Sequence, residues 1–160
     1  MTDARDAVRH LLAVIAYRTS KSVRGAPATF ASFRTSPTTR TPVEILAHMG
    51  DLMDWGLRMS REKPKWNDAA PQAWEDEVRR FFAAVTAWDA YLATGAPIAA
   101  PIEKILAGPI ADCLNHTGQL NLLRRVSGSP VKGESYARAD IRIGQTGLEQ
   151  PPANPEYEFD

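Results

Sequence analysis

The sequence has little of what an exported or membrane-spanning protein carries. Its single cysteine, Cys113, cannot form an internal disulfide, which is typical of a protein in a reducing compartment. No run of apolar residues is long enough to span a bilayer. The first residues, MTDARDAVRHLLAVIAY, include acidic side chains and make a poor signal peptide. We therefore expect a cytoplasmic protein with no membrane partner.

An excess of positive charge is also missing. Nineteen Lys and Arg residues balance nineteen Asp and Glu residues, so no basic field is available to hold phosphates. We therefore expect no nucleic-acid partner. The glycine-rich loops of nucleotide-binding proteins and the GxSxG motif of serine hydrolases are both absent from the sequence, so no motif supports either of these two functions.

What the sequence does contain is helical periodicity. With 160 residues, 44% of them apolar, the chain is long enough for one packed domain. Apolar residues recur at steps of three and four in the segments 3–23, 41–61, 71–95 and 101–126. Residues 129–160 hold several prolines and show no helical period. The pattern predicts an all-α single domain, with a four-helix bundle over residues 1–128 and an irregular C-terminal tail over residues 129–160 that packs on it.

Local signals refine this prediction. Thr41 and Glu44 have the spacing of a capping box, with Pro42 at the first helical position, so the second helix should begin there. Pro109 lies inside the fourth helical segment, where its missing N–H should kink the helix. Within the tail only residues 139–143 alternate between apolar and polar, which predicts a short extended arm.

Two of the predicted helices carry a histidine on the stripe that should face the core. The stripe of the second helix consists of Ile45, His48, Leu52, Trp55 and Met59. The stripe of the fourth consists of Pro109, Cys113, His116, Leu120 and Leu123. Asp112 lies one turn before His116, with its side chain projecting to the same side. Because an unpartnered buried imidazole costs on the order of 1–3 kcal/mol, each inward histidine needs a partner.

One arrangement satisfies all three groups, namely the convergence of His48, Asp112 and His116 on a divalent metal. Two imidazoles and a carboxylate suit zinc, nickel or ferrous iron. The alternative is a plain His–Asp ion pair beside a hydrogen-bonded core histidine, with no metal. Gln119, one turn beyond His116, and Asp51, three residues after His48, are the candidates for groups that orient the ligands. For Asp51 a solvated position is the other interpretation.

The chain resembles the DinB-like superfamily, also called the YfiT-like metalloenzymes, in the stretches TPVEILAHMGDLMDW and GPIADCLNHTGQLNLLRRVSGSPVKGESY. This resemblance implies a four-helix bundle with one metal-binding histidine on the second helix and an HxxxH pair on a later one. His48 and His116 match two of these positions. Asp112 stands where the commoner pattern has another histidine, and thiol-dependent relatives also use a carboxylate at this step. The resemblance further implies activation of a low-molecular-weight thiol and pairing into a homodimer.

Two hypotheses about function follow. The first is a metal-dependent hydrolase or thiol transferase, whose three protein ligands leave a coordination position open for a small-molecule substrate. The second is a non-catalytic, dimeric bundle whose histidines and aspartate hold a structural ion or one another. The sequence identifies neither the substrate nor a catalytic residue beyond the metal ligands.

Overall fold

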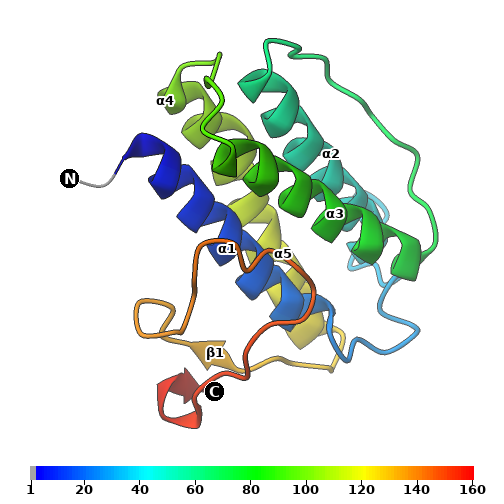
Figure 1. Ribbon diagram of the computed structural model, residues 1–160. Helices are drawn as coiled ribbons and strands as arrows, with labels where there is room; N and C mark the ends of the chain where they lie inside the picture. The colour runs from blue at the N-terminus through cyan, green and yellow to red at the C-terminus, as the bar shows by residue number, and fades with distance from the viewer. Residues whose placement is uncertain (1–2) are drawn as a thin grey trace.

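The computed structural model describes residues 3–160, and most of them belong to a helical bundle (Figure 1). Its long helices are α1 (Ala4–Val23), α2 (Pro42–Ser60), α3 (Trp74–Ala93) and α5 (Ala111–Val126), the last preceded by the short α4 (Ile102–Ile105). Around the bundle, α1 contacts α3 and α5, and α2 contacts the same two helices from the other side. The predicted all-α four-helix bundle is confirmed.

The start of α2 follows the predicted capping box. Thr41 accepts a hydrogen bond from the backbone N–H of Glu44, and the Glu44 carboxylate accepts from the backbone N–H of Thr41. Pro42 occupies the first turn, where its missing N–H leaves no helical bond unmade. This cap fixes where α2 begins and therefore which of its residues face α5.

The predicted kink at Pro109 takes a different form. Residues Leu106–Ile110 form a π-helical turn between α4 and α5, so the helix widens by one residue at the proline. A π-turn accommodates a residue that cannot donate the usual bond and whose ring would meet the carbonyl four residues earlier. The turn sets the rotation of α5, and thereby the direction in which its polar side chains point.

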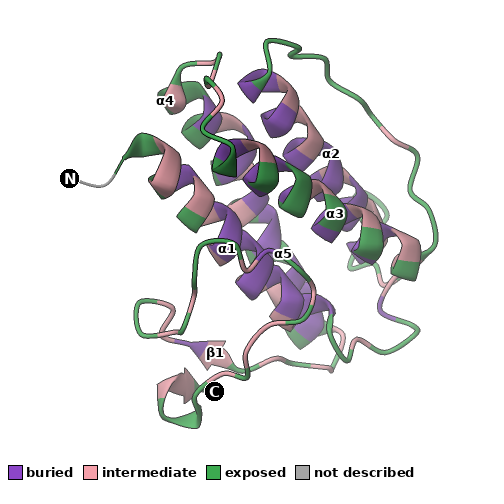
Figure 2. Ribbon diagram, in the orientation of Figure 1, coloured by how far each residue is buried: buried purple, intermediate pink, exposed green. Residues whose placement is uncertain are grey.

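The core fills the space between the helices, as the buried inner faces in Figure 2 show. Trp88 of α3 is fully buried, and its indole N–H donates to the Ser60 hydroxyl at the end of α2. A Cβ atom at Gly56 would overlap the Trp88 ring, so glycine allows α2 and α3 to approach each other closely. Among residues 3–160, no helix has the length and apolar character needed to cross a bilayer.

The C-terminal tail folds across one end of the bundle (Figure 1). Its strands β1 (Gly133–Glu134) and β2 (Glu158–Phe159) pair antiparallel, and a 3-10 turn, Pro155–Tyr157, precedes β2. The buried Glu134 carboxylate accepts hydrogen bonds from Tyr17 and Lys21 of α1, which anchors β1 to the bundle. The extended arm predicted over residues 139–143 forms no strand. Residue 139 lies in a bend, residues 140–142 have no regular secondary structure and residue 143 begins a turn, while the strand pairing of the tail involves Gly133–Glu134 and Glu158–Phe159.

Candidate metal centre

The two histidine-bearing stripes face each other across the α2–α5 contact. His48 projects from α2 toward α5, where His116 lies one turn after Asp112. One ligand atom from each of the three side chains lies within 4.8 Å of the other two. The structure thus brings together the three residues that the sequence singled out, in a cluster that could hold a metal ion.

The Asp112 carboxylate lies between the two imidazoles. Its Oδ1 is 3.3 Å from Nε2 of His116, and its Oδ2 is 3.5 Å from Nε2 of His48. The two rings stand nearly perpendicular, at 89°, with their centroids 4.8 Å apart. Both histidines therefore direct the same ring nitrogen, Nε2, to the middle of the cluster.

Gln119 fixes the orientation of His116. Its Oε1 lies 2.8 Å from Nδ1 of the ring, one turn further along α5. Because an amide oxygen only accepts, Nδ1 carries the proton in this pair. In a neutral His116 the Nε2 atom then carries the lone pair and points toward the Asp112 carboxylate. This tautomer is the one in which Nε2 can bind a metal.

The charge state of His48 also suits a ligand. Burial lowers the pKa of His48, and the neighbouring His116 and Arg40 lower it further, against the opposing effect of Asp112. At neutral pH the His48 ring is therefore largely uncharged, with a lone pair available.

The Asp112 side chain is more exposed than expected for a carboxylate that faces the core. Its side chain is 43% exposed, whereas that of His116 is 11% exposed. The helical rotation explains this difference, because Asp112 falls between the buried Cys113 and the exposed Ala111 on the boundary of the core-facing stripe. The cluster therefore lies at the rim of the bundle, where solvent and small molecules reach it.

Asp51 is buried rather than solvated. It is 2% exposed, and its carboxylate accepts hydrogen bonds from the Arg80 guanidinium of α3 and from the backbone N–H of Ala69. These bonds run to α3 and to the loop after α2 rather than to His48. Arg80 also binds the fully buried Glu77, so Asp51 belongs to an ionic link between α2 and α3.

Two neighbours of the cluster were not found from the sequence. Trp66, in the loop after α2, places its ring centroid 5.5 Å from that of His48 and 5.8 Å from that of Trp55. Arg40, at the end of the loop after α1, lines a cavity with His48 and a second one with His116. Both residues lie in irregular segments, where no periodicity indicates which way a side chain points.

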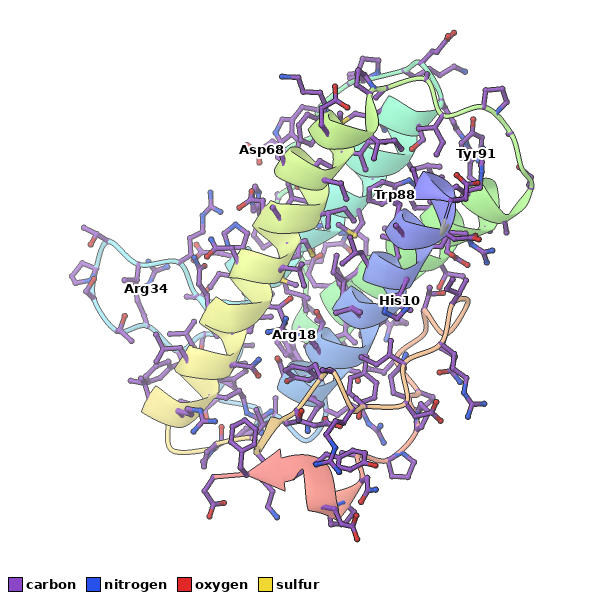
Figure 3. All side chains as sticks on the ribbon, turned by 90° about the vertical axis from the view of Figure 1, so that its left-hand side faces the viewer. His10, Arg18, Arg34, Asp68, Trp88 and Tyr91 are labelled. Carbon is purple, nitrogen blue, oxygen red and sulfur yellow. The ribbon has the colours of Figure 1, made fainter. Side chains whose placement is uncertain are left out.

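The remaining thiol and imidazole stay outside the centre. Cys113 is fully buried in the core, and burial raises the pKa of its thiol far above the usual range, so it is inert packing rather than a nucleophile. His10 is exposed on α1. In Figure 3 it lies to one side of α5, whereas Asp68 and Arg34, from the two loops that flank the cluster, lie to the other.

No protein-family model, curated protein or solved structure matches this chain. The resemblance to the DinB-like superfamily therefore stays a prediction that depends on the motifs quoted above.

Proposed function

We propose that the protein is a divalent-metal-dependent enzyme in which His48, Asp112 and His116 hold the ion and leave a coordination position open for a small-molecule substrate. The observation that carries this proposal is the meeting of three possible metal ligands. The Nε2 atoms of His116 and His48 lie 3.3 and 3.5 Å from the two oxygens of the Asp112 carboxylate. A divalent cation between them would bind all three groups at once.

The donor set supports zinc, nickel or ferrous iron. Two histidines and one carboxylate are ligands that these ions share, and three protein ligands are typical of catalytic rather than structural sites. The bond from His116 to Gln119 supplies the outer hydrogen bond that metal-binding histidines usually make. The exposed side of Asp112 leaves the approach from solvent open.

When bound, the ion would act as a Lewis acid that lowers the pKa of a coordinated water or thiol. Activation of water leads to a hydrolase. Activation of a low-molecular-weight thiol leads to a transferase, which is what the resemblance to the DinB-like superfamily implies. The chain's own part is to fix the two Nε2 atoms through the α2–α5 packing and through Gln119. The same resemblance supports a homodimer.

The test is elemental analysis of protein purified without chelator or histidine tag, alongside His116→Ala and the control His10→Ala. We expect about one equivalent of zinc, nickel or iron in the wild type and in the control, and none in His116→Ala. The loaded protein is then assayed for ester hydrolysis and for conjugation of cysteine, as a probe thiol, to an activated electrophile. Loss of the activity on metal removal and its return on reloading would support the enzyme.

A non-catalytic bundle is the competing function, and one observation favours it. Asp112 lies within ion-pair distance of both histidines, so a protonated His116 would complete a triad without metal. Folded protein that carries no metal and refuses added zinc, nickel and ferrous iron would support this function and contradict the enzyme.

A further inference from the structure

A cavity of about 460 Å³ opens directly beside the proposed metal centre. The loop before α2 forms one wall and the last turns of α5 form the other, while His116 and Gln119 line the end next to the centre. Its volume lies within the range of cavities that hold small molecules. The position of His116 in its wall means that a molecule bound there would lie next to the metal ligands.

The wall formed by α5 is apolar. Leu122 is 60% exposed and Val126 is 55% exposed, and both line the cavity next to the buried Leu123. Large aliphatic side chains cost solvation free energy when they face water, and an apolar guest would remove that cost. The cavity therefore favours a molecule with a hydrocarbon body.

Arg40 supplies a positive charge at the wall of this cavity. Its side chain is exposed, and within residues 3–160 no hydrogen bond or ion pair joins it to another residue. Arg34, in the same loop, is by contrast bound to the Glu44 carboxylate and to backbone carbonyls. The structure thus leaves one guanidinium of this loop without a partner, at the edge of the apolar cavity.

A second cavity, of about 350 Å³, lies on the His48 side of the centre and shares Arg40 with the first. Its wall includes Glu44 and Asp51, whose carboxylates bind Arg34 and Arg80, and also Asp68, an acidic residue that would repel an anion. An anionic group that reaches Arg40 is therefore expected from the apolar side, with its hydrocarbon part against α5.

We propose that this cavity binds an amphipathic carboxylate, with Arg40 holding the carboxylate and Leu122, Leu123 and Val126 holding the apolar body. The inference names the substrate class of the enzyme and so rests on the proposed function. Arginine suits this task because its planar guanidinium binds a carboxylate through two parallel hydrogen bonds. A carboxylate held at Arg40 would keep the rest of the molecule beside His116.

The experiment compares phenylacetate with its neutral counterpart, phenylacetamide. Each is titrated into metal-free, isotope-labelled protein and followed by two-dimensional amide NMR, so that a carboxylate cannot bind through the metal. We expect shifts in the loop before α2 and in the last turns of α5, with phenylacetate bound more tightly. Arg40→Ala should weaken phenylacetate by about tenfold and leave phenylacetamide unchanged, since charge-assisted hydrogen bonds contribute on this scale.

Two further variants separate charge from apolar contact. Arg125→Ala removes an equal charge from an exposed position of α5 outside the cavity, and we expect it to bind both probes as the wild type does. Leu122→Asn keeps the charge and lowers the apolar area, so both probes should weaken together. Equal binding of the two probes to the wild type, or an equal loss in Arg125→Ala and Arg40→Ala, would overturn the proposal.

A second copy of the chain is the other possible occupant of the apolar face. Light scattering of the wild type and of Leu122→Asn tests this. A dimer that dissociates in Leu122→Asn, together with no binding of either probe, would assign the face to a partner subunit and overturn the proposal. The metal analysis is independent of this experiment, because Arg40→Ala should keep its metal. An experiment that contradicts carboxylate binding in the cavity can therefore be distinguished from one that contradicts the metal centre.

Discussion

The bond between Gln119 and His116 makes a measurable prediction about metal affinity. Gln119→Leu removes the acceptor that lies 2.8 Å from Nδ1 and releases the ring to rotate and to place its proton on Nε2, the ligand atom. Loss of such an outer hydrogen bond typically lowers metal affinity by about 10- to 100-fold. Because Gln119 is exposed, water can take over part of its role, so we expect the lower end, about tenfold, or about 1.4 kcal/mol.

The opposite change should act in the opposite direction. In Gln119→Glu a carboxylate accepts from Nδ1–H, and charge-assisted hydrogen bonds are about twice as strong as neutral ones, so zinc should bind more tightly than in the wild type. Asn115→Ala, an exposed amide one turn earlier on α5, is the matched control and should change nothing.

The assay is competition for zinc against a chromophoric chelator at fixed pH, with thermal unfolding of the metal-free proteins measured in parallel. The unfolding data separate a loss of ligand orientation from a loss of fold. Equal zinc affinities for the leucine, glutamate and wild-type proteins would refute the reasoning, because Nδ1 would then not determine the state of Nε2.

Three further predictions concern the bundle that supports the centre. Gly56→Ala places a methyl group into the Trp88 ring and should lower the free energy of unfolding in urea by about 1–3 kcal/mol, as overpacking does; an unchanged midpoint would contradict the close approach of α2 and α3. Arg80→Met leaves the Asp51 carboxylate buried without its cation and should cost about 3–5 kcal/mol, part of which Asp51→Asn in the same chain should restore. Burial and a hydrogen bond to a tail carboxylate raise the pKa of Tyr17, so its hydroxyl ionises first in the unfolded chain; the contribution of Tyr17 to stability should be constant below about pH 10 and decrease above it, and Tyr17→Phe should reduce that decrease in pH-dependent unfolding.

The sequence predicted the cluster of His48, Asp112 and His116 because helical periodicity indicates which residues share one face of a helix. His48 and His116 each occupy a slot at steps of three and four among apolar residues, and Asp112 precedes His116 by one turn. Those relations hold in any packing that buries both stripes. Two buried stripes on neighbouring helices of one bundle face each other, so the pattern favoured convergence of the three side chains, whereas the level along the helix axes at which they meet depends on the packing.

Periodicity could not predict what the loops and the irregular turn contribute. Arg40 and Trp66 reach the centre from segments without a repeat, and their positions depend on how each loop crosses the bundle. The π-turn at Pro109 depends on a balance between a missing hydrogen bond and the packing of α5. Asp51 looked solvated because its partner, Arg80, lies on another helix and gives no local signal.

The buried carboxylates offer a comparison that bears on the centre. Within residues 3–160, each carboxylate residue classed as buried lies within 3 Å of an Arg or Lys nitrogen; these are Asp51, Glu77, Asp89 and Glu134. Asp112 has no such cation and instead faces two imidazole nitrogens at longer distances. The side chain of Asp112 is 43% exposed, so water can solvate its carboxylate, whereas the buried acids need a fixed cation. A positive charge beside Asp112 would come from solution, either as a proton on one of the two imidazoles or as a metal ion, and the metal analysis proposed above distinguishes the two.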